Sequence, residues 1–186
     1  LAPGGRTGTT EVDGASLFIH VVRPHAFDVV LFGNGHVGRA LVQVLGALPC
    51  RVRWIDEREH DFPATVPDNV EIVATDAPAA EVADAPRGAY VVVMTHSHDL
   101  DFDIVEAALE RHDWAYLGLI GSKPKRAQFE RRLAARGAPE TDLARVTCPI
   151  GAQSGLSSKE PGAIAVGVAA EMLGVRERLR AASESS

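Results

Sequence analysis

Apolar residues along the chain fall into short runs that alternate with longer segments in which they recur at helical spacing. The short runs predict β-strands at residues 28–32, 51–55, 70–73, 90–94, 115–120 and 145–147. The run at 90–94 is mostly valine, which is typical of a strand buried on both faces of a parallel sheet. Helical spacing predicts helices at residues 37–48, 99–111, 124–136 and 161–173. Because strands alternate with helices, we predict an α/β fold with a three-layer, doubly wound, mostly parallel, Rossmann-like sheet.

The predicted helix ends rest on residues that cap or break helices. Pro124 stands where the first turn of a helix tolerates proline, and Gly137 ends the same helix. Ser158 is the predicted N-cap of the last helix, and Gly174 is its predicted end. The tail at 181–186 is predicted to fray.

The first 25 residues have a different character from the rest. They are rich in Gly and Thr, become strand-like over residues 16–22, and reach a proline at position 24. We interpret residues 1–25 as an extended N-terminal arm or as the remnant of a preceding domain. Residues 26–186 then form the Rossmann-like domain.

A glycine motif, GNGHVG at residues 33–38, lies between the first core strand and the first helix. In this context Gly33 allows a tight turn, Gly35 lets a phosphate approach the backbone, and Gly38 lets the helix pack on the strand. Asp56 ends the next strand, where the acid that binds a ribose is expected in such folds. The motif predicts a bound nucleotide or nucleotide-like ligand. The alternative is a Rossmann fold that keeps its glycines for packing alone.

A histidine-containing segment, THSHDLD at residues 95–101, follows the valine-rich strand. It is close to the zinc motif THxHxDH but lacks the Asp-His pair at its end, so we predict no metal site. His96 and His98 are candidate polar ligands to a bound cofactor, because the loop leaves the carboxyl end of a strand. In the alternative interpretation this is an ordinary loop in which Asp99 caps the next helix.

The segment GSKPKR at residues 121–126 leaves the next strand and opens a helix. It lacks the spacing of a Walker A motif, but it offers backbone N–H groups, a hydroxyl group and cations at a helix N-terminus. Such a segment suits a phosphate or another anion, and ordinary helix capping is the alternative. Because ligands of Rossmann sheets bind at the carboxyl ends of the strands, the three loops together predict one site.

The composition narrows the class of protein. Apolar residues make up 46% of the chain and charged residues 24%, which is typical of a soluble globular domain. The net charge of -6 argues against a nucleic-acid-binding surface, and no apolar run is long enough to span a bilayer. We therefore expect neither nucleic acid nor a membrane as a partner. Two cysteines without a secretion signal favour a reducing compartment, so we expect a cytoplasmic protein.

The sequence contains no obvious nucleophile–base pair and no carboxylate pair suited to general acid–base catalysis. Cys148 is expected to be a buried structural thiol. We therefore expect a binding protein rather than an enzyme.

Several segments together resemble the xanthine dehydrogenase accessory protein family, XdhC/CoxI. The matching segments are VVLFGNGHVGRALVQVL, WIDEREHDFP, VVVMTHSHDLD, YLGLIGSKPKRAQFERRL and CPIG followed by a helix start that contains KEP. They cover roughly residues 24–175 in the order found in the family. The MTHSHDLD and GLIGSKPKR segments are much more specific than the glycine motif.

The resemblance implies a chaperone for the molybdenum cofactor in its molybdopterin form. Such a protein protects the cofactor while a cysteine desulfurase helps to install the sulfido ligand, and then delivers it to a xanthine dehydrogenase-type molybdoenzyme. A homodimer is compatible with this role. The positions that match the family motifs, and that are expected to bind cofactor, are Gly33, Gly35, His36, Gly38, Thr95, His96, His98, Gly121, Ser122 and Lys123.

Two other functions remain open from the sequence. The glycine motif and Asp56 are also compatible with an NAD(P)-dependent oxidoreductase. A regulatory or interaction module with a vestigial Rossmann site is the third hypothesis.

Overall fold

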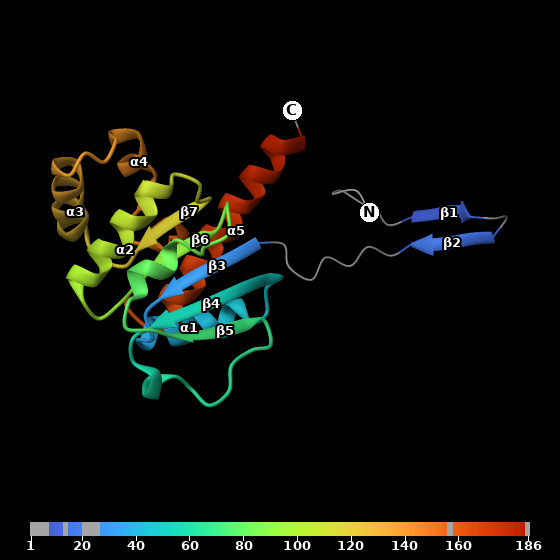
Figure 1. Cartoon of the computed structure of the whole chain (residues 1–186), viewed down its shortest axis with the longest axis horizontal. Helices are drawn as coiled ribbons and strands as arrows, with labels where there is room; N and C mark the ends of the chain where they lie inside the picture. The colour runs from blue at the N-terminus through green and yellow to red at the C-terminus, as the bar shows by residue number, and fades with distance from the viewer. Residues whose placement is uncertain (1–7, 13–14, 20–26, 156–157, 185–186) are drawn as a thin grey trace.

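A computed structural model describes residues 8–12, 15–19, 27–155 and 158–184, and its centre is a six-stranded parallel sheet (Figure 1). The strands of this sheet are β3 (Phe27–Phe32), β4 (Cys50–Asp56), β5 (Val70–Ala74), β6 (Tyr90–Val93), β7 (Tyr116–Leu119) and β8 (Val146–Thr147). Near the N-terminus, β1 (Gly8–Val12) and β2 (Ala15–Ile19) pair as an antiparallel hairpin. The hairpin covers part of the strand-like segment predicted at 16–22, and residues 20–22 lie outside the described residues.

The strand order in the sheet is β5-β4-β3-β6-β7-β8, and every neighbouring pair is parallel. The chain therefore builds outward from β3 in one direction and then returns to build outward in the other. This is the doubly wound order of a Rossmann sheet, and it places the reversal of strand order between β3 and β6. The predicted α/β fold is confirmed.

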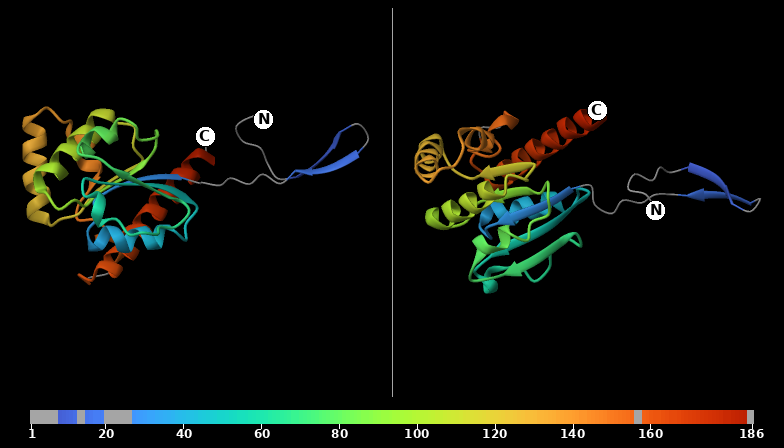
Figure 2. Two further views of the ribbon diagram at one scale, coloured as in Figure 1. Left: turned by 60° about the horizontal axis from the view of Figure 1, so that its bottom comes forward. Right: turned by 45° about the horizontal axis from the view of Figure 1, so that its top comes forward.

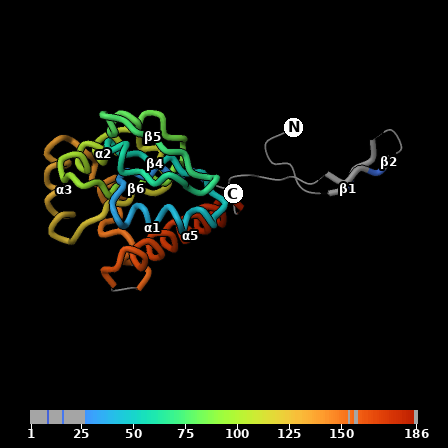
Figure 3. Tube along the Cα trace, turned by 90° about the horizontal axis from the view of Figure 1, so that it is seen from below, coloured from blue at the N-terminus to red at the C-terminus, as the bar shows by residue number. Residues whose placement is uncertain are grey.

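Helices cover both faces of the sheet, which makes the predicted three layers. The helices are α1 (His36–Leu45), α2 (His98–Arg111), α3 (Lys123–Ala135), α4 (Glu140–Arg145) and α5 (Pro161–Glu184), with 3-10 turns η1 (Glu59–Asp61), η2 (Pro78–Val82) and η3 (Ala152–Ser154). Figure 2 shows α1 and α2 on opposite sides of the strands, and Figure 3 shows α1 and α5 side by side on one face. The other face is covered by α2 and α3.

Two hydrophobic clusters hold the layers together, one on each face of the sheet. Along β3, Val29 and Leu31 pack toward α1 and α5, whereas Val30 and Phe32 pack toward α2 and α3. Successive side chains of a strand point to opposite faces, so a strand covered on both faces must be apolar at every position. This is why the buried strands appear in the sequence as short continuous apolar runs.

The last helix differs from its prediction at both ends. It begins at Pro161, and Ser158 Oγ accepts a hydrogen bond from the Glu160 N–H at 3.1 Å outside the helix, so the predicted Ser158 N-cap is wrong. It continues through Gly174 to Glu184, so the predicted end at Gly174 is also wrong. A helix-interior glycine costs only about 1 kcal/mol relative to alanine, and the following Arg, Glu, Leu and Ala residues favour helix strongly enough to outweigh it.

Two smaller corrections concern the C-terminal part of the chain. Residues 181–184 of the tail belong to α5 instead of fraying, and 185–186 lie outside the described residues. The short helix α4 precedes β8 and was not predicted.

No helix of the described chain has the length and apolar character needed to cross a membrane.

Candidate functional site

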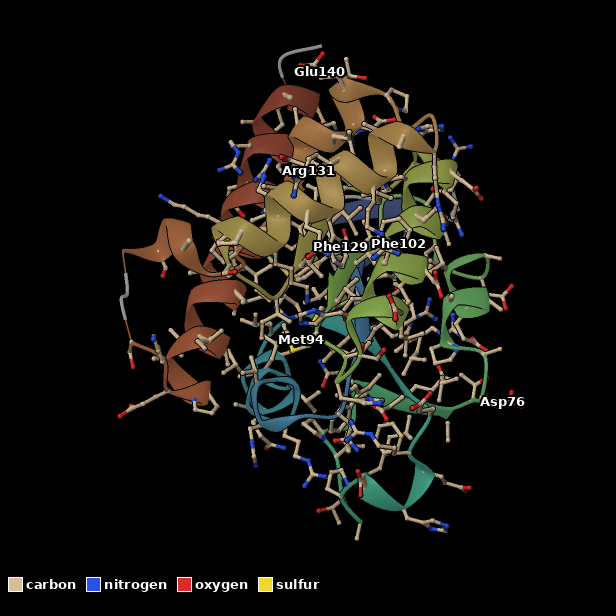
Figure 4. All side chains as sticks on the ribbon, turned by 90° about the vertical axis from the view of Figure 1, so that its left-hand side faces the viewer. Asp76, Met94, Phe102, Phe129, Arg131 and Glu140 are labelled. Carbon is tan, nitrogen blue, oxygen red and sulfur yellow. The ribbon has the colours of Figure 1, made fainter. Side chains whose placement is uncertain are left out.

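Four polar segments meet at the carboxyl edge, which is the edge of the six-stranded sheet where its parallel strands end. They are the glycine turn after β3 (33–38), the end of β4 (56–58), the histidine loop after β6 (95–98) and the Gly-Ser-Lys loop after β7 (121–123). Because β4 and β6 flank β3, the glycine turn lies between the end of β4 and the histidine loop. Figure 4 looks onto this edge, where Met94, the residue after β6, lies beside α1.

Gly33 occupies a position that only glycine fits. Its φ is +116°, and a Cβ atom there would stand 2.2 Å from the carbonyl oxygen of Met94. The N–H of Gly33 donates to the Ile55 carbonyl at 2.9 Å, and its own carbonyl accepts from Trp54 Nε1 at 2.9 Å. The first glycine therefore packs the turn against the ends of both neighbouring strands.

The other two glycines of the motif have different surroundings. A Cβ atom at Gly38 would stand 2.2 Å from the Gly33 carbonyl oxygen, so this glycine lets α1 pack directly on the turn. A Cβ atom at Gly35 would meet nothing within 4 Å, and Gly35 caps α1 without a side-chain hydrogen bond. The backbone at Gly35 is therefore open to a ligand, beside a helix N-terminus whose first N–H groups and dipole favour an anion.

Asp56 joins the end of β4 to the glycine turn. Its side chain is only 2% exposed. Oδ2 accepts hydrogen bonds from the backbone N–H of Asn34 at 2.6 Å and from Arg58 Nη2 at 2.9 Å. Oδ1 accepts from the backbone N–H of Arg58 at 2.9 Å and from Arg58 Nε at 2.8 Å. The carboxylate thus holds the glycine turn and the segment after β4 together.

The charge on Asp56 is stabilised despite its burial. Burial alone would raise the pKa of Asp56, but hydrogen bonds from Arg58 and Asn34 outweigh it and lower the pKa. In return, the carboxylate raises the pKa of Arg58. An ionised carboxylate with its own guanidinium partner is therefore a fixed part of the edge.

A second guanidinium braces the glycine turn from α1. Arg39 Nε donates to Asn34 Oδ1 at 3.1 Å, and Arg39 Nη2 donates to the carbonyl oxygen of Asp61. By contrast, Asn34 Nδ2 is buried and has no hydrogen-bond partner within the described part of the chain. The rim of the turn thus carries two guanidinium groups, those of Arg39 and Arg58.

The histidine loop connects β6 to α2. Ser97 caps α2, because its Oγ accepts a backbone hydrogen bond at 3.3 Å from the first helical turn, so the alternative of a capping Asp99 is wrong. His96 and His98 are both exposed. His96 Nε2 lies 3.3 Å from Glu57 Oε1, so the loop reaches past the end of β3 to the segment after β4.

The Gly-Ser-Lys loop opens α3. Ser122 caps this helix, and its Oγ accepts a hydrogen bond from the Lys125 N–H at 3.4 Å. Pro124 lies in the first turn, as predicted. Lys123 is the first residue of α3 and is exposed. Capping by Ser122 is therefore confirmed, and anion binding beside the exposed Lys123 stays a prediction.

A buried ion pair, Asp101–Lys125, links the histidine loop to the Gly-Ser-Lys loop. Asp101 Oδ2 and Lys125 Nζ are 2.6 Å apart, and the two side chains are 1% and 9% exposed. Asp101 Oδ1 accepts from the N–H and the hydroxyl of Thr95 at 2.9 and 2.8 Å. Lys125 Nζ also donates to the Ile120 carbonyl at 3.0 Å. The ends of β6 and β7 are therefore tied to each other through the interior.

The structure places all of the sequence-predicted site residues at the carboxyl edge. His36, His98 and Lys123 are each the first residue of a different helix, α1, α2 and α3, and all three are exposed. This puts three ionisable nitrogen-bearing side chains at three helix N-termini along one edge. Their role in ligand binding stays a prediction.

A cavity of about 260 Å³ extends this edge toward α5. Its walls include Ile120 and Gly121, the turn at 149–152, and the segment before α5 with Ser158 and Lys159. Lys159 is exposed and adds one more cation to the rim. The cavity therefore adjoins the Gly-Ser-Lys loop rather than the glycine turn.

Neither the buried pair Asp101–Lys125 nor the Asp56–Arg58 pair was predicted from the sequence. Asp101 falls on the buried face of α2, and a charge at such a position is a usable signal of a buried partner, since isolated buried charges are rare. The identity of the partner was not accessible, because Lys125 is 24 residues away along the chain.

Both cysteines are free and buried. Burial raises the pKa of the Cys148 thiol, as expected for the structural thiol that was predicted.

Among the residues that the structure describes, no group of three or more His, Cys, Asp or Glu side chains could hold a metal ion.

The strand order and the glycine turn define a Rossmann-type domain, and the N-termini of α1, α2 and α3 lie at its carboxyl edge. Binding of an anionic ligand at this edge stays a prediction. Residues 29–172 match the family model of the XdhC Rossmann domain. The chain belongs to the XdhC family, and the resemblance found in the sequence is confirmed.

Two similar proteins extend this finding. The chain is 30% identical over 161 residues to the uncharacterized protein YqeB of Escherichia coli strain K12. The matched region covers 85% of this chain and 28% of YqeB. It is also similar to the crystal structure of a xanthine dehydrogenase, BH1974, from Bacillus halodurans, with a TM-score of 0.65 and 24% identity. That match covers 82% of this chain and 43% of BH1974, and at this identity it supports the fold alone. The chain thus spans less than half the length of either protein.

Proposed function

We propose that this domain binds the molybdenum cofactor, in its molybdopterin form, and takes part in its delivery to a xanthine dehydrogenase-type molybdoenzyme. Membership of the XdhC family supports a role in xanthine dehydrogenase maturation. The observation that carries the proposal is the open backbone at Gly35, which lies at a helix N-terminus without a side-chain cap.

The residues at the carboxyl edge fit the chemistry of this cofactor. Molybdopterin carries a phosphate group, and its dithiolene holds an anionic metal centre. The first turn of α1 beside Gly35 suits the phosphate, because its N–H groups and dipole attract an anion. At neighbouring helix N-termini, exposed Lys123 supplies a cation and exposed His98 a ring nitrogen for the remaining anionic groups.

A carrier must release its cargo, and this edge holds groups that bind without reacting. Hydrogen bonds from helix N-termini and exposed side chains form and break without covalent chemistry. In this proposal the domain protects the cofactor while a cysteine desulfurase supplies sulfur to it, and the molybdoenzyme then receives it. A homodimer of the carrier is compatible with both steps.

Calorimetric titration with molybdenum cofactor tests the proposal directly. The complex is then gel-filtered, and the fluorescence of the acid-oxidised pterin identifies the cargo. We expect saturable binding, followed by transfer of pterin to an apo-xanthine dehydrogenase. A folded chain that neither retains nor transfers pterin would contradict the proposal.

The alternative function is an NAD(P)-dependent oxidoreductase, which the glycine turn also suits. Titration with NADH and NADPH in the same assay separates the two. Dinucleotide binding with hydride transfer, and without pterin binding, would favour the oxidoreductase. Binding of neither ligand would favour an interaction module whose Rossmann site is vestigial.

A further inference from the structure

Asp56 stands where a Rossmann fold places the acid that binds a ribose, but its oxygens are already engaged. An ionised carboxylate offers about four lone-pair positions. Four N–H donors reach Asp56 at 2.6–2.9 Å, one from the backbone of Asn34 and three from Arg58. No lone pair is left for the hydroxyl groups of a ribose.

Arg58 is the residue that a ribose would have to displace. Its Nε and Nη2 atoms contact the two different oxygens of Asp56, which is the bidentate arrangement that makes arginine–carboxylate pairs strong. The Arg58 side chain is 34% exposed and that of Asp56 is 2% exposed, so the guanidinium stands between the carboxylate and solvent. A second carboxylate, Asp61 Oδ2, lies 3.3 Å from Arg58 Nη1 and holds the guanidinium from its other side.

We infer that Arg58 is a specificity-determining residue. Its guanidinium group occupies the carboxylate of Asp56, so that a ribose diol cannot bind there. The glycine turn then binds ligands that carry a phosphate without a ribose at that position. The inference rests on the proposed function only in placing a phosphate-bearing ligand at the glycine turn. Asp56, the last residue of β4, then serves as a brace of the turn, since its carboxylate accepts the hydrogen bond from the Asn34 N–H.

The test compares NADH, which has a ribose diol, with inorganic pyrophosphate, which has none, by calorimetry on the full chain. We expect pyrophosphate to bind the wild type and NADH to bind it weakly. The Arg58→Ala variant frees lone pairs on Asp56, so its affinity for NADH is expected to rise about tenfold or more, while its affinity for pyrophosphate stays within about threefold. In the double variant Asp56→Asn/Arg58→Ala the gain in NADH affinity is expected to disappear, because the carboxylate is gone.

Two further variants control for folding and for charge. Arg58→Lys keeps a cation beside Asp56, so this variant is expected to remain folded. Because lysine cannot contact both carboxylate oxygens as a fork, the variant is expected to gain part of the NADH affinity. Arg51→Ala removes the same charge from the exposed start of β4, where Arg51 pairs with Asp28, and is expected to leave NADH affinity unchanged.

Either of two results would overturn the inference. The first is that the wild type binds NADH and the Asp56→Asn variant binds it more weakly, since Asp56 would then contact the ribose. The second is an NADH affinity in folded Arg58→Ala and Arg58→Lys no higher than in the wild type. Pterin binding is measured separately, so a failure of the proposed function leaves the NADH comparison intact.

Discussion

Two buried carboxylates organise the carboxyl edge, and each is neutralised by a cation of its own. Asp56 holds Arg58 and the glycine turn, whereas Asp101 holds Lys125 and Thr95. A buried charge that loses its partner is costly, so both pairs hold the ends of their loops in a single arrangement. Lys123, by contrast, is exposed at the same edge.

Removal of the charge on Asp101 is expected to destabilise the fold. Asp101→Asn leaves the Lys125 ammonium group buried without its counter-charge, and such changes cost about 3–5 kcal/mol of the free energy of unfolding. Urea unfolding measures this loss. Glu130→Gln breaks the partly exposed Arg126–Glu130 pair on α3 and is expected to cost less than about 1 kcal/mol. Equal losses in the two variants would contradict a special role for the buried pair.

Reversal of the charge at Lys123 is expected to weaken an anionic ligand. Because Lys123 begins α3, Lys123→Glu replaces a cation with an anion at a helix N-terminus, and we expect the affinity for molybdenum cofactor to fall about tenfold. Arg131→Glu makes the same change of charge on the exposed part of α3 labelled in Figure 4, and should have little effect. Calorimetry on both variants compares them. An unchanged affinity of Lys123→Glu would remove the Gly-Ser-Lys loop from the site.

At the scale of elements, the glycine turn separates the requirements of folding from those of binding. Gly33→Ala forces a side chain onto the Met94 carbonyl at a positive φ, so it is expected to destabilise the fold by well over about 1 kcal/mol. At Gly35 an added Cβ atom meets nothing within 4 Å, so the fold is expected to survive Gly35→Val. The larger side chain fills the space that a phosphate needs, and cofactor binding is expected to be lost. Thermal unfolding and calorimetry measure the two effects, and a Gly35→Val variant that binds normally would exclude the turn from the site.

The helices set which polar groups face a ligand, because their N-termini lie at the carboxyl edge of the parallel sheet. Ser97 and Ser122 satisfy backbone N–H groups at α2 and α3, whereas the N-cap of α1 is Gly35, which makes no side-chain hydrogen bond. The helix with the least satisfied N-terminus is therefore the one beside the open glycine. Among these three helices, we therefore predict the anion site at the first turn of α1.

At the scale of the whole molecule, ionised carboxyl groups couple stability to pH. Burial alone would raise the pKa of Asp56, but hydrogen bonds from Arg58 outweigh it and lower the pKa. A hydrogen bond from Arg111 lowers the pKa of Asp113. A carboxyl group whose pKa is lower in the folded chain contributes its full stability above its unfolded pKa of about 4. That contribution is lost as the pH falls through the folded pKa.

The free energy of unfolding is therefore expected to decrease on acidification below about pH 4. Urea unfolding over a series of pH values measures this slope, and Asp56→Asn should reduce it. Asp113→Asn should reduce it less, because the Asp113 side chain is 23% exposed and better screened by solvent. An acid slope that Asp56→Asn leaves unchanged would show that Asp56 is not held ionised by Arg58.

The sequence by itself determined the α/β class, the positions of most strands and helices and the three polar loops at strand ends. It could do so because burial on both faces of a sheet requires continuous apolar runs, and because glycine, serine and proline at turns and caps act locally. Where local terms were close in energy, as at Gly174, the prediction of the helix end was wrong.

Only the tertiary structure decided how the loops are joined and which charges remain exposed. Asp101 meets Lys125 because β6 and β7 are neighbours in the sheet, and Asp56 meets Asn34 because β4 lies beside β3. These partners are more than 20 residues apart along the chain, so no local pattern records their contact. The same packing brings the Asn34 N–H to Asp56 and leaves Gly35 open, because hydrogen-bond capacity is assigned by proximity in space.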